Sequence, residues 1–454
     1  MNNKLFHLTI VRSVLRRVLW KLLITNPDLL LLLNLNKLKK YRNNIISKFE
    51  RENQKRILKS GPQSVRIPPI NMCNYKCLFC EIHKDDLLFP NRVKNMISLE
   101  DIKRFEYFLS TTSALNFYGG SAEPLINKNF SDIVKYLKNK YGMSMMVNTN
   151  ASVLNKRMAD IFINYGFDYI LTSYHAGTRD GYKWLMTGNI EKVNENIQYL
   201  ISRRNILKKK KPQVVFNFAI HKKNVNEFRK VIDNANVLGV DSILVSRYYG
   251  GFNKLQEYNP TYDEDVDEGN KVLDDIYIYA KKRNVKLTPV KPLYWQKKPN
   301  EVVWEPDNYD KKKKCVLPWT NLQFNPVLDD KSCLYVGVCN RIILFKLNYE
   351  KVSLLTAKDS RKLWNHSVLQ YMRETVNAEN INPICKYCKN YDRGMLRNLD
   401  EIRYGKIRDD TVKEFFLVFR EKYEYSNIDG LEVLTDNPLD NEKNKEVLKT
   451  FYEK

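Results

Sequence analysis

Short apolar runs alternate with amphipathic stretches between residues 63 and 283. Six runs have the length and composition of buried strands, and the stretches between them have the apolar period of helices. The expected strands are 65–71, 114–118, 143–148, 168–173, 213–220 and 242–247. The expected helices are 98–110, 129–140, 154–164, 188–203, 224–237 and 264–283. This alternation predicts parallel strands joined by right-handed helical crossovers.

Six strand–helix units predict an α/β fold, a partial (β/α)6 TIM-like barrel. A flat doubly wound sheet has the same periodicity and stays open as an alternative. Two segments have the form of capping boxes that begin helices, Ser98-Leu-Glu-Asp101 and Asn224-Val-Asn-Glu227. The periodicity fades after residue 283, and the Lys-, Pro- and Asn-rich segment 291–314 indicates a linker or covering loop.

These changes along the chain divide it into four expected regions. A basic helical extension precedes the barrel, and a small cysteine-rich α+β module and a tail without readable chemistry follow it. The expected limits are 1–62 for the extension, 63–300 for the barrel, 310–392 for the module and 393–454 for the tail.

The positive charge is concentrated at the N-terminus. The 454 residues carry a formal net charge of +24, which favours anionic partners. Residues 5–25 predict a basic amphipathic helix, which either lies on an anionic membrane surface or packs as a collar on the core. The longest apolar run, Leu29–Leu33, is too short for a bilayer span of about 20 residues. We expect a cytoplasmic protein, with peripheral contact to the inner face of the membrane as an option.

The cysteines fall into two groups, which indicates metal sites in a reducing compartment rather than a disulfide framework. The first group is Cys73, Cys77 and Cys80; the second is Cys315, Cys333, Cys339, Cys385 and Cys388.

The first group forms one tight loop directly after a strand. A structural zinc site usually needs four ligands, and His83 is the one further candidate nearby. Three thiolates instead suit an iron–sulfur cluster that keeps one iron open to a ligand. An iron–sulfur cluster is therefore favoured, and zinc stays as the alternative.

The segment Met72-Cys-Asn-Tyr-Lys-Cys-Leu-Phe-Cys80 resembles the radical S-adenosylmethionine (SAM) superfamily, including the aromatic Phe79 before the third cysteine. The resemblance implies that Cys73, Cys77 and Cys80 hold a [4Fe–4S] cluster whose open iron binds SAM. In that family the reduced cluster cleaves SAM to methionine and a 5′-deoxyadenosyl radical. The radical then abstracts a hydrogen atom from the substrate.

Other strand ends fit the same resemblance. Gly119-Gly120-Ser121-Ala122-Glu123-Pro124 is similar to the GGEP segment of the family, which implies that Gly119, Gly120 and Glu123 bind the cofactor. Asn148 and Ser173 end later strands and are either cofactor contacts or turn residues. His175, two residues further on, is a candidate catalytic acid or base, or a supporting hydrogen-bonding group.

The second group supplies candidate ligands from a hairpin and a knuckle. Cys315-Val-Leu-Pro-Trp319 and Leu363-Trp-Asn365 resemble SPASM/twitch modules. The resemblance implies one auxiliary [4Fe–4S] cluster; a zinc site is the alternative. The expected ligands are Cys315, Cys333, Cys385 and Cys388. Cys339 replaces Cys333 as a ligand, is an ordinary buried cysteine, or donates a hydrogen atom as a catalytic residue of an epimerase.

The resemblance implies an oxidoreductase or epimerase that is reduced by flavodoxin or ferredoxin. A sugar or a lipid- or nucleotide-linked glycan is the first substrate expectation, and a ribosomally made peptide is the alternative. A zinc-stabilised nucleic-acid-binding protein is the alternative outside the enzymes. It is disfavoured because the sequence has neither a recognisable nucleic-acid module nor a focused basic, aromatic-rich stripe, so no nucleic-acid partner is expected.

Overall fold

The computed structural model describes most of the chain between residues 39 and 434. The described residues are 39–80, 82–88, 95–118, 122–248, 254–255, 266–289, 296–298, 301–303, 315–326, 333–339, 344–348, 356–379, 381–386, 407–429 and 431–434.

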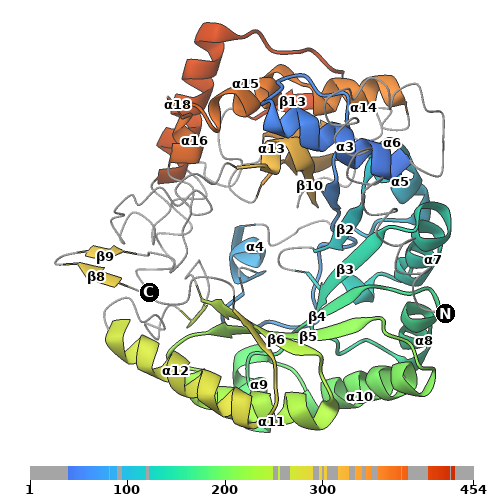
Figure 1. The fold of residues 1–454 in the computed structure, drawn as a ribbon, viewed down its shortest axis with the longest axis vertical. Helices are drawn as coiled ribbons and strands as arrows, with labels where there is room; N and C mark the ends of the chain where they lie inside the picture. Colours follow the sequence, from blue (N-terminus) through green and yellow to red (C-terminus); the bar gives the residue numbers. More distant parts are fainter. Residues whose placement is uncertain are drawn as a thin grey trace, which may run out of the picture.

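A curved parallel sheet forms the centre of the molecule (Figure 1). Its strands pair side by side in chain order, with Arg66 opposite Asn116 and Ser173 opposite Asn217 among the register pairs. The strands are β1 (Ser64–Arg66), β2 (Ala114–Phe117), β3 (Ser144–Thr149), β4 (Tyr169–Ser173), β5 (Gln213–Ile220), β6 (Ser242–Arg247) and β7 (Leu287–Pro289). This arrangement confirms the expected α/β fold, with a mostly parallel sheet of the partial-barrel kind.

Helices cover the convex side of the sheet, as Figure 1 shows for α7, α8, α10, α11 and α12, whereas α4 lies within the curve. The bounds are α4 (Ile82–Leu88), α5 (Leu99–Arg104), α6 (Glu106–Thr111), α7 (Phe130–Tyr141), α8 (Lys156–Asn164), α9 (Arg179–Met186), α10 (Ile190–Ile206), α11 (Phe228–Leu238) and α12 (Val266–Lys282), with short 3-10 turns η2 (Pro124–Ile126) and η3 (Val225–Glu227).

The strands alternate between a fully buried and a half-buried face. On β3, Met145, Val147 and Thr149 are buried, whereas Met146 and Asn148 are half-buried. Because successive side chains of a strand point to opposite faces, the buried set lies beneath the helices and the half-buried set lines the concave side. That concave side is the one open to a ligand.

The cysteine-rich module continues the same sheet beyond β1. Strand β10 pairs with β1 in parallel, Val65 opposite Leu322, and the following strands pair antiparallel. The new elements are α13 (Leu317–Thr320), β10 (Asn321–Pro326), β11 (Cys333–Gly337), β12 (Phe345–Asn348), α14 (Ala357–Trp364), α15 (Ser367–Thr375), α16 (Pro383–Lys386), α18 (Ile407–Lys422) and β13 (Leu431–Val433). Residues from the expected tail therefore complete the sheet edge.

A buried arginine connects the module to the segment before the barrel. The Arg373 guanidinium is fully buried and donates to the backbone carbonyls of Pro318, Trp364 and Arg56. The helix α3 (Lys39–Glu52) lies against α13 and α6. The N-terminal helix, the barrel and the module thus share one joint, and the expected domain limits stay a prediction.

Three local expectations need correction. Residues 98–110 form two short helices, α5 and α6, and the Ser98 capping box is present as expected. Asn224 is not a capping-box residue: its side chain accepts from the His221 amide and donates to the His175 carbonyl. Part of the expected loop 291–314 instead forms a hairpin of β8 (Gln296–Lys298) and β9 (Glu301–Val303).

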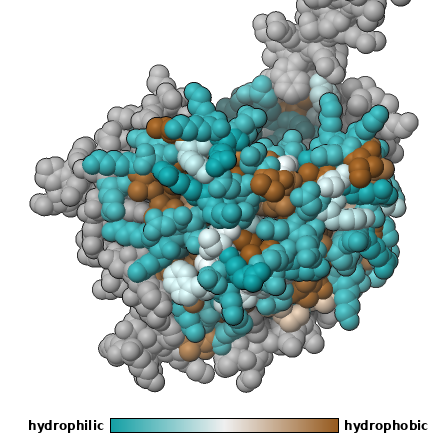
Figure 2. Space-filling model, turned by 90° about the horizontal axis from the view of Figure 1, so that it is seen from below, coloured by the Kyte–Doolittle hydropathy of each residue, from teal (hydrophilic) through white to brown (hydrophobic). Residues whose placement is uncertain are grey.

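The outer surface is mainly hydrophilic. Figure 2 shows one face on which hydrophilic residues predominate and hydrophobic residues are scattered among them. Among the helices of the described ranges, none combines the length and hydropathy needed to cross a membrane. The expected membrane-surface helix, residues 5–25, lies outside the described residues.

Candidate functional site

The Cys73–Cys80 loop lies beyond the carboxyl end of β1 and is held by contacts from three other segments. The Leu78 amide donates to the Leu185 carbonyl at 2.9 Å, and the Lys76 amide donates to Thr187 Oγ1 at 2.8 Å. From the end of β3, Asn150 Nδ2 donates to Asn74 Oδ1 at 3.0 Å.

The ring of Tyr75 packs against the turn after α9. A Cβ atom added to Gly188 would lie 2.3 Å from Tyr75 Cζ, so this position has room for glycine alone. The loop is therefore positioned by α9, by the end of β3 and by its own aromatic residue, independently of any bound group.

The three thiols of the loop lie near one another. Burial raises the pKa of Cys73 to about 11, and burial together with the neighbouring thiols Cys80 and Cys73 raises the pKa of Cys77. Such thiols become thiolates when a cation binds them. In an iron–sulfur cluster each of the three thiolates would bind a different iron. Three neighbouring thiols on one loop fit that arrangement.

Backbone groups already contact the sulfur atoms. The Tyr75 amide donates to Cys73 Sγ at 3.4 Å, and the Ile82 amide donates to Cys80 Sγ at 3.4 Å. The Cys77 thiol donates to the Met186 carbonyl at 3.4 Å. Hydrogen bonds to cysteine sulfur are one of the means by which proteins adjust the reduction potential of a cluster.

Glu123 connects this loop to the end of β3. Its carboxylate is fully buried and accepts from Thr149 Oγ1 and the Asn150 amide, both at 2.6 Å, while its own amide donates to the Met72 carbonyl. Burial raises the pKa of Glu123 to about 7 against the opposing effect of these donors. Protein groups occupy this carboxylate, so the geometry favours a positioning role, and the expected cofactor contact stays a prediction.

Asn148 and Asn116 place unsatisfied oxygen atoms on the concave face. Both Asn148 Oδ1 and Asn116 Oδ1 are buried, and neither has a hydrogen-bond partner among the described residues. A buried acceptor without a donor is costly, so a bound ligand with N–H or O–H groups would satisfy it. Ser173 lies on the same face of β4. The expected ligands Gly119 and Gly120 lie outside the described residues.

His175 is near the loop, but its position argues against the expected acid–base role. The imidazole is buried, and its Nδ1 accepts from the Ala219 amide at 2.9 Å. Burial lowers the pKa of His175 to about 3, with His221 adding to the effect. The ring of Phe79 lies edge-on at 4.5 Å. Burial thus favours the neutral imidazole, and the contact with Phe79 suits a supporting role beside the cysteine loop; the catalytic role expected from the sequence stays a prediction.

Two asparagines position Cys315 and Cys385 around the end of α15. Asn377 and Cys315 exchange two hydrogen bonds, at 3.0 and 3.1 Å. Asn382 accepts from the Cys385 amide at 3.0 Å and donates to Thr375 Oγ1. Asn377 and Asn382 thus bring cysteines that are far apart in the sequence to one corner of the module.

Strand register separates Cys333 from Cys339. Cys333 begins β11 at the hairpin end, near Pro326, whereas Cys339 lies two residues past Gly337, which pairs with Gln323. Six residues of extended chain span about 20 Å, so the two thiols cannot bind one cluster. Cys339 lies where β10 begins, one helical turn from Cys315.

This register corrects two expectations about the module. Cys339, rather than Cys333, is at the end of the sheet that holds Cys315. Because β10 runs parallel to β1 with Asn321 opposite Ser64, this end is opposite to the Cys73 loop. A hydrogen-atom donor at Cys339 would therefore be remote from the first site. Cys388 lies outside the described residues.

Arg66 lies between the two cysteine regions and was missed by the sequence interpretation. It is on the concave face of β1, donates to Gln323 Oε1 at 3.3 Å and stacks over the Tyr118 ring at 3.9 Å. Burial lowers its pKa. The signal in the sequence is one charged residue inside an otherwise apolar strand, which favours a ligand contact over a core position.

Together the fold and the site define a class: a partial barrel of parallel strands with a three-thiol loop at its carboxyl end. Residues 67–235 match the sequence profile described as the Radical SAM superfamily. The chain therefore contains a radical SAM domain, and the cofactors of that family are a [4Fe–4S] cluster and SAM.

Curated relatives are similar to part of the chain. A protein of Saccharolobus islandicus (strain L.S.2.15 / Lassen #1) named "Probable GTP 3′,8-cyclase" is 26% identical over 206 residues, covering 42% of this chain and 59% of the relative. One of the same name from Sulfurisphaera tokodaii is 25% identical over 240 residues, covering 51% and 69%. The chain thus matches about three fifths of the length of the first relative.

Solved structures extend the likeness of fold beyond the barrel. The crystal structure of Streptococcus suis SuiB bound to its precursor peptide SuiA has a TM-score of 0.54 and 16% identity, covering 82% of this chain and 80% of that one. At this identity the likeness concerns the fold alone.

Proposed function

We propose that this protein is a SAM-dependent radical enzyme whose cluster is held by Cys73, Cys77 and Cys80. The observation that carries the proposal is the fixed loop at the carboxyl end of β1, held by α9 and the end of β3. Active sites of such barrels lie at the carboxyl ends of the strands.

The residues fit the cofactors by their chemistry. Three neighbouring thiols supply three ligands and leave one iron open, and the unsatisfied Asn148 oxygen suits a donor of SAM. When bound, the cluster and SAM supply a 5′-deoxyadenosyl radical that abstracts a hydrogen atom from the substrate. The chain's own part is to hold the loop, through Asn150 and Thr187, and to exclude water around it with Leu78, Leu185 and Leu255.

An auxiliary cluster in the module is part of the proposal. Cys315 and Cys385 are fixed by asparagines at one corner, and Cys339 is at the same end of the sheet. Cys388 follows Cys385 by three residues and is the fourth ligand in this assignment. The concave face between the two cysteine regions then forms the substrate space, with Arg66 and Asn116 as its polar groups.

A peptide is the proposed substrate. SuiB shares the fold over most of this chain, and its crystal structure contains a precursor peptide. The concave face offers amide and guanidinium groups, from Asn116, Asn148 and Arg66, that suit backbone carbonyls and amides. Reduction by flavodoxin or ferredoxin belongs to the same proposal.

A nucleotide is the second candidate. The curated relatives are GTP 3′,8-cyclases by name, and the half-buried Arg66 cation suits a phosphate. Sugar oxidation or epimerisation, the first expectation from the sequence, is supported by neither the named relatives nor the concave face.

Isotope transfer tests the proposal and separates the two candidates. Anaerobically reconstituted protein, reduced with dithionite, is incubated with SAM and either a library of deuterated peptides or deuterated GTP. Transfer of deuterium from a peptide into 5′-deoxyadenosine supports a peptide substrate. Transfer from GTP, with none from any peptide, supports a nucleotide substrate instead. Absence of 5′-deoxyadenosine under all conditions would refute both.

A further inference from the structure

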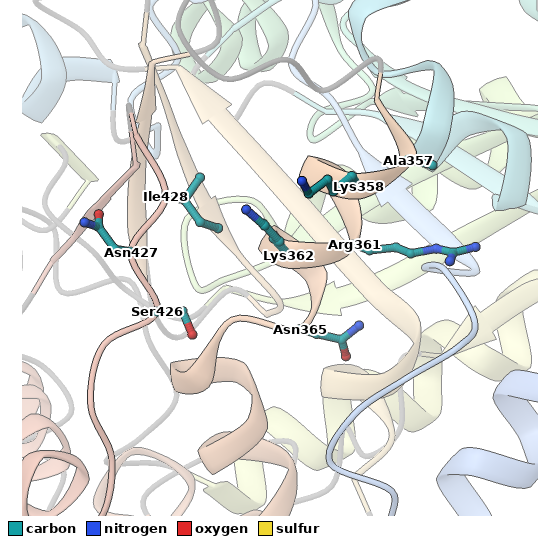
Figure 3. A pocket seen from close by; sticks show the side chains of 8 residues that line it. All are labelled: Ala357, Lys358, Arg361, Lys362, Asn365, Ser426, Asn427 and Ile428. Atoms are coloured by element: carbon teal, nitrogen blue, oxygen red, sulfur yellow. The ribbon is translucent and has the colours of Figure 1, made fainter.

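A groove on the outside of the module is lined by cations. It encloses about 620 Å³ between α14 and the segment after α18. Lys358, Arg361, Lys362 and Asn365 follow one face of α14 at helical spacing, opposite Ser426, Asn427 and Ile428 (Figure 3). This volume is within the range of ligand sites.

The walls of the groove are fixed by buried contacts. Ser426 and Ser367 exchange two hydrogen bonds between amide and hydroxyl groups, at 3.0 and 3.1 Å. The fully buried His366 donates from Nε2 to the Ser426 carbonyl at 2.7 Å. On the other wall, Arg361 Nε donates to Tyr107 Oη on α6. The groove therefore has a defined shape before any ligand arrives.

The charge of the groove is not neutralised by the protein. Lys358, Arg361 and Lys362 are exposed, and within the described ranges none of them forms an ion pair with a carboxylate. The carboxylate of Asp359, between them in sequence, instead accepts from the hydroxyl of the capping residue Thr356. Cations without a carboxylate partner in a concavity attract an anionic ligand.

The lining favours an acidic peptide over a nucleic acid. Among the described residues, no aromatic side chain lines the groove, so this part has no platform on which a base could stack. Asn427 and Ser426 supply an amide and a hydroxyl group that suit a peptide backbone. Strand β13, which follows this segment, is the terminal strand of the described sheet, and such an edge is able to pair with an added extended segment.

We propose that this groove binds an acidic segment of the peptide substrate, so that another part of the same peptide is free to enter the barrel. The proposal rests on a peptide as the substrate of the proposed function. The link between α14 and α6 places the groove outside the barrel, and therefore its occupation does not obstruct the concave face. The charge of Lys358 and Lys362 selects the segment, and the amide of Asn427 holds its backbone.

Binding of a labelled peptide tests the groove without any need for turnover. The probe is a fluorescein-labelled dodecapeptide of alternating Glu and Gly, compared with the same peptide carrying Gln in place of Glu, by fluorescence anisotropy on the reconstituted full chain. The test variant is Lys358→Glu/Lys362→Glu. The matched control is Lys281→Glu/Lys282→Glu, which reverses two exposed lysines at the end of α12.

We expect the test variant to bind the Glu peptide at least about tenfold more weakly than wild type, and the control variant within about twofold of wild type. The Gln peptide should bind wild type about as weakly as the Glu peptide binds Lys358→Gln/Lys362→Gln, because both pairs lack the attraction between opposite charges. Lys358→Gln/Lys362→Gln removes the charge without reversing it and should give an intermediate loss of affinity for the Glu peptide. This variant replaces the test variant if the test variant unfolds at a lower temperature than wild type.

Equal affinity of wild type for both peptides, or an equal loss of affinity in the test and control variants, would contradict the proposal that the groove binds an acidic segment. A single-stranded RNA that binds more tightly than the Glu peptide, with the same dependence on Lys358 and Lys362, would overturn the peptide assignment. Formation of 5′-deoxyadenosine is measured separately in wild type. If 5′-deoxyadenosine forms while the groove variants bind the Glu peptide normally, the groove proposal is wrong and the proposed function stands. If the groove binds the Glu peptide as expected but no 5′-deoxyadenosine forms, the groove proposal stands and the proposed function is wrong.

Discussion

The two cysteine regions of this protein are built in different ways. In the first, three cysteines lie within eight residues of one loop, and the barrel positions that loop as a unit. In the second, the cysteines come from the segment before α13, from the chain just past the end of β11 and from α16, and asparagines and strand register position them. Local spacing determines the first site, whereas tertiary structure determines the second.

This difference explains why the sequence indicates the first region more directly than the second. A tight loop keeps its members close in any fold, so spacing alone is informative. For Cys333 and Cys339 the spacing is six residues, but extended chain turns that spacing into about 20 Å. The comparison therefore suggests experiments on each region and on the joint between them.

The largest expected effect comes from the first region. Replacing Cys73, Cys77 and Cys80 together by alanine should abolish SAM cleavage and remove about four of about eight iron atoms. The module should keep the remaining iron, because its candidate ligands lie at the other end of the sheet. Iron analysis and chromatography of 5′-deoxyadenosine check this. Loss of all iron would show that the two regions are not independent.

The second effect distinguishes two cysteines on one strand. Cys339→Ser should remove about four iron atoms, whereas Cys333→Ser should leave the iron content unchanged, because β11 places the two thiols at opposite ends. Each variant is the control for the other. Loss of iron in Cys333→Ser together with an unchanged iron content in Cys339→Ser would contradict the assignment from strand register.

The joint between the regions should be sensitive to Arg373. Arg373→Met leaves two buried carbonyl groups and one half-buried carbonyl group without this donor and should lower the free energy of unfolding by about 3–5 kcal/mol. Arg420→Met, at an exposed arginine of α18, should cost less than about 1 kcal/mol. Urea unfolding measures both. Similar losses for the two variants would mean that Arg373 does not secure the joint.

A smaller effect depends on pH and on one histidine of the module. Burial lowers the pKa of the fully buried His366 to about 4, and its Nδ1 caps α15 by accepting from the Val368 amide. A depressed pKa means that His366 contributes stability above pH 6.5, and that this contribution is lost as the pH falls through 4. The loss should reach about 3 kcal/mol.

His366→Gln should remove that part of the pH dependence. The contributions of the buried His175 and His221 are common to wild type and variant, so the difference between the two unfolding curves isolates His366. Unfolding free energies at several pH values between 6.5 and 4 measure it. Parallel curves would show that His366 is not responsible.

The sequence predicted the strands of the barrel well, because parallel strands covered by helices are continuous apolar runs with turns between them. Residues 213–220 and 242–247 match β5 and β6 at both ends. The roles of single residues were harder to predict. The Glu123 carboxylate proved to be engaged by β3, and the His175 ring by the Ala219 amide, because both depend on contacts between units far apart in the chain.

The same limit applies to Arg66 and to the groove beside α14, which the sequence pattern did not indicate. Arg66 stands in an apolar run, and its environment comes from Tyr118 on the next strand and from Gln323 on a strand of the module. The cations of α14 have the helical spacing of an ordinary solvated face, and the opposite wall comes from residues 426–428. In both cases the partner lies in a segment that the local pattern cannot indicate.

The most direct test of the central claim is the reductive cleavage of SAM by the anaerobically reconstituted full chain. We expect brown protein with about eight iron atoms that forms 5′-deoxyadenosine and methionine in equal amounts when reduced with dithionite. The negative control is the variant in which alanine replaces Cys73, Cys77 and Cys80. Colourless protein that binds stoichiometric zinc and leaves SAM intact would contradict the account.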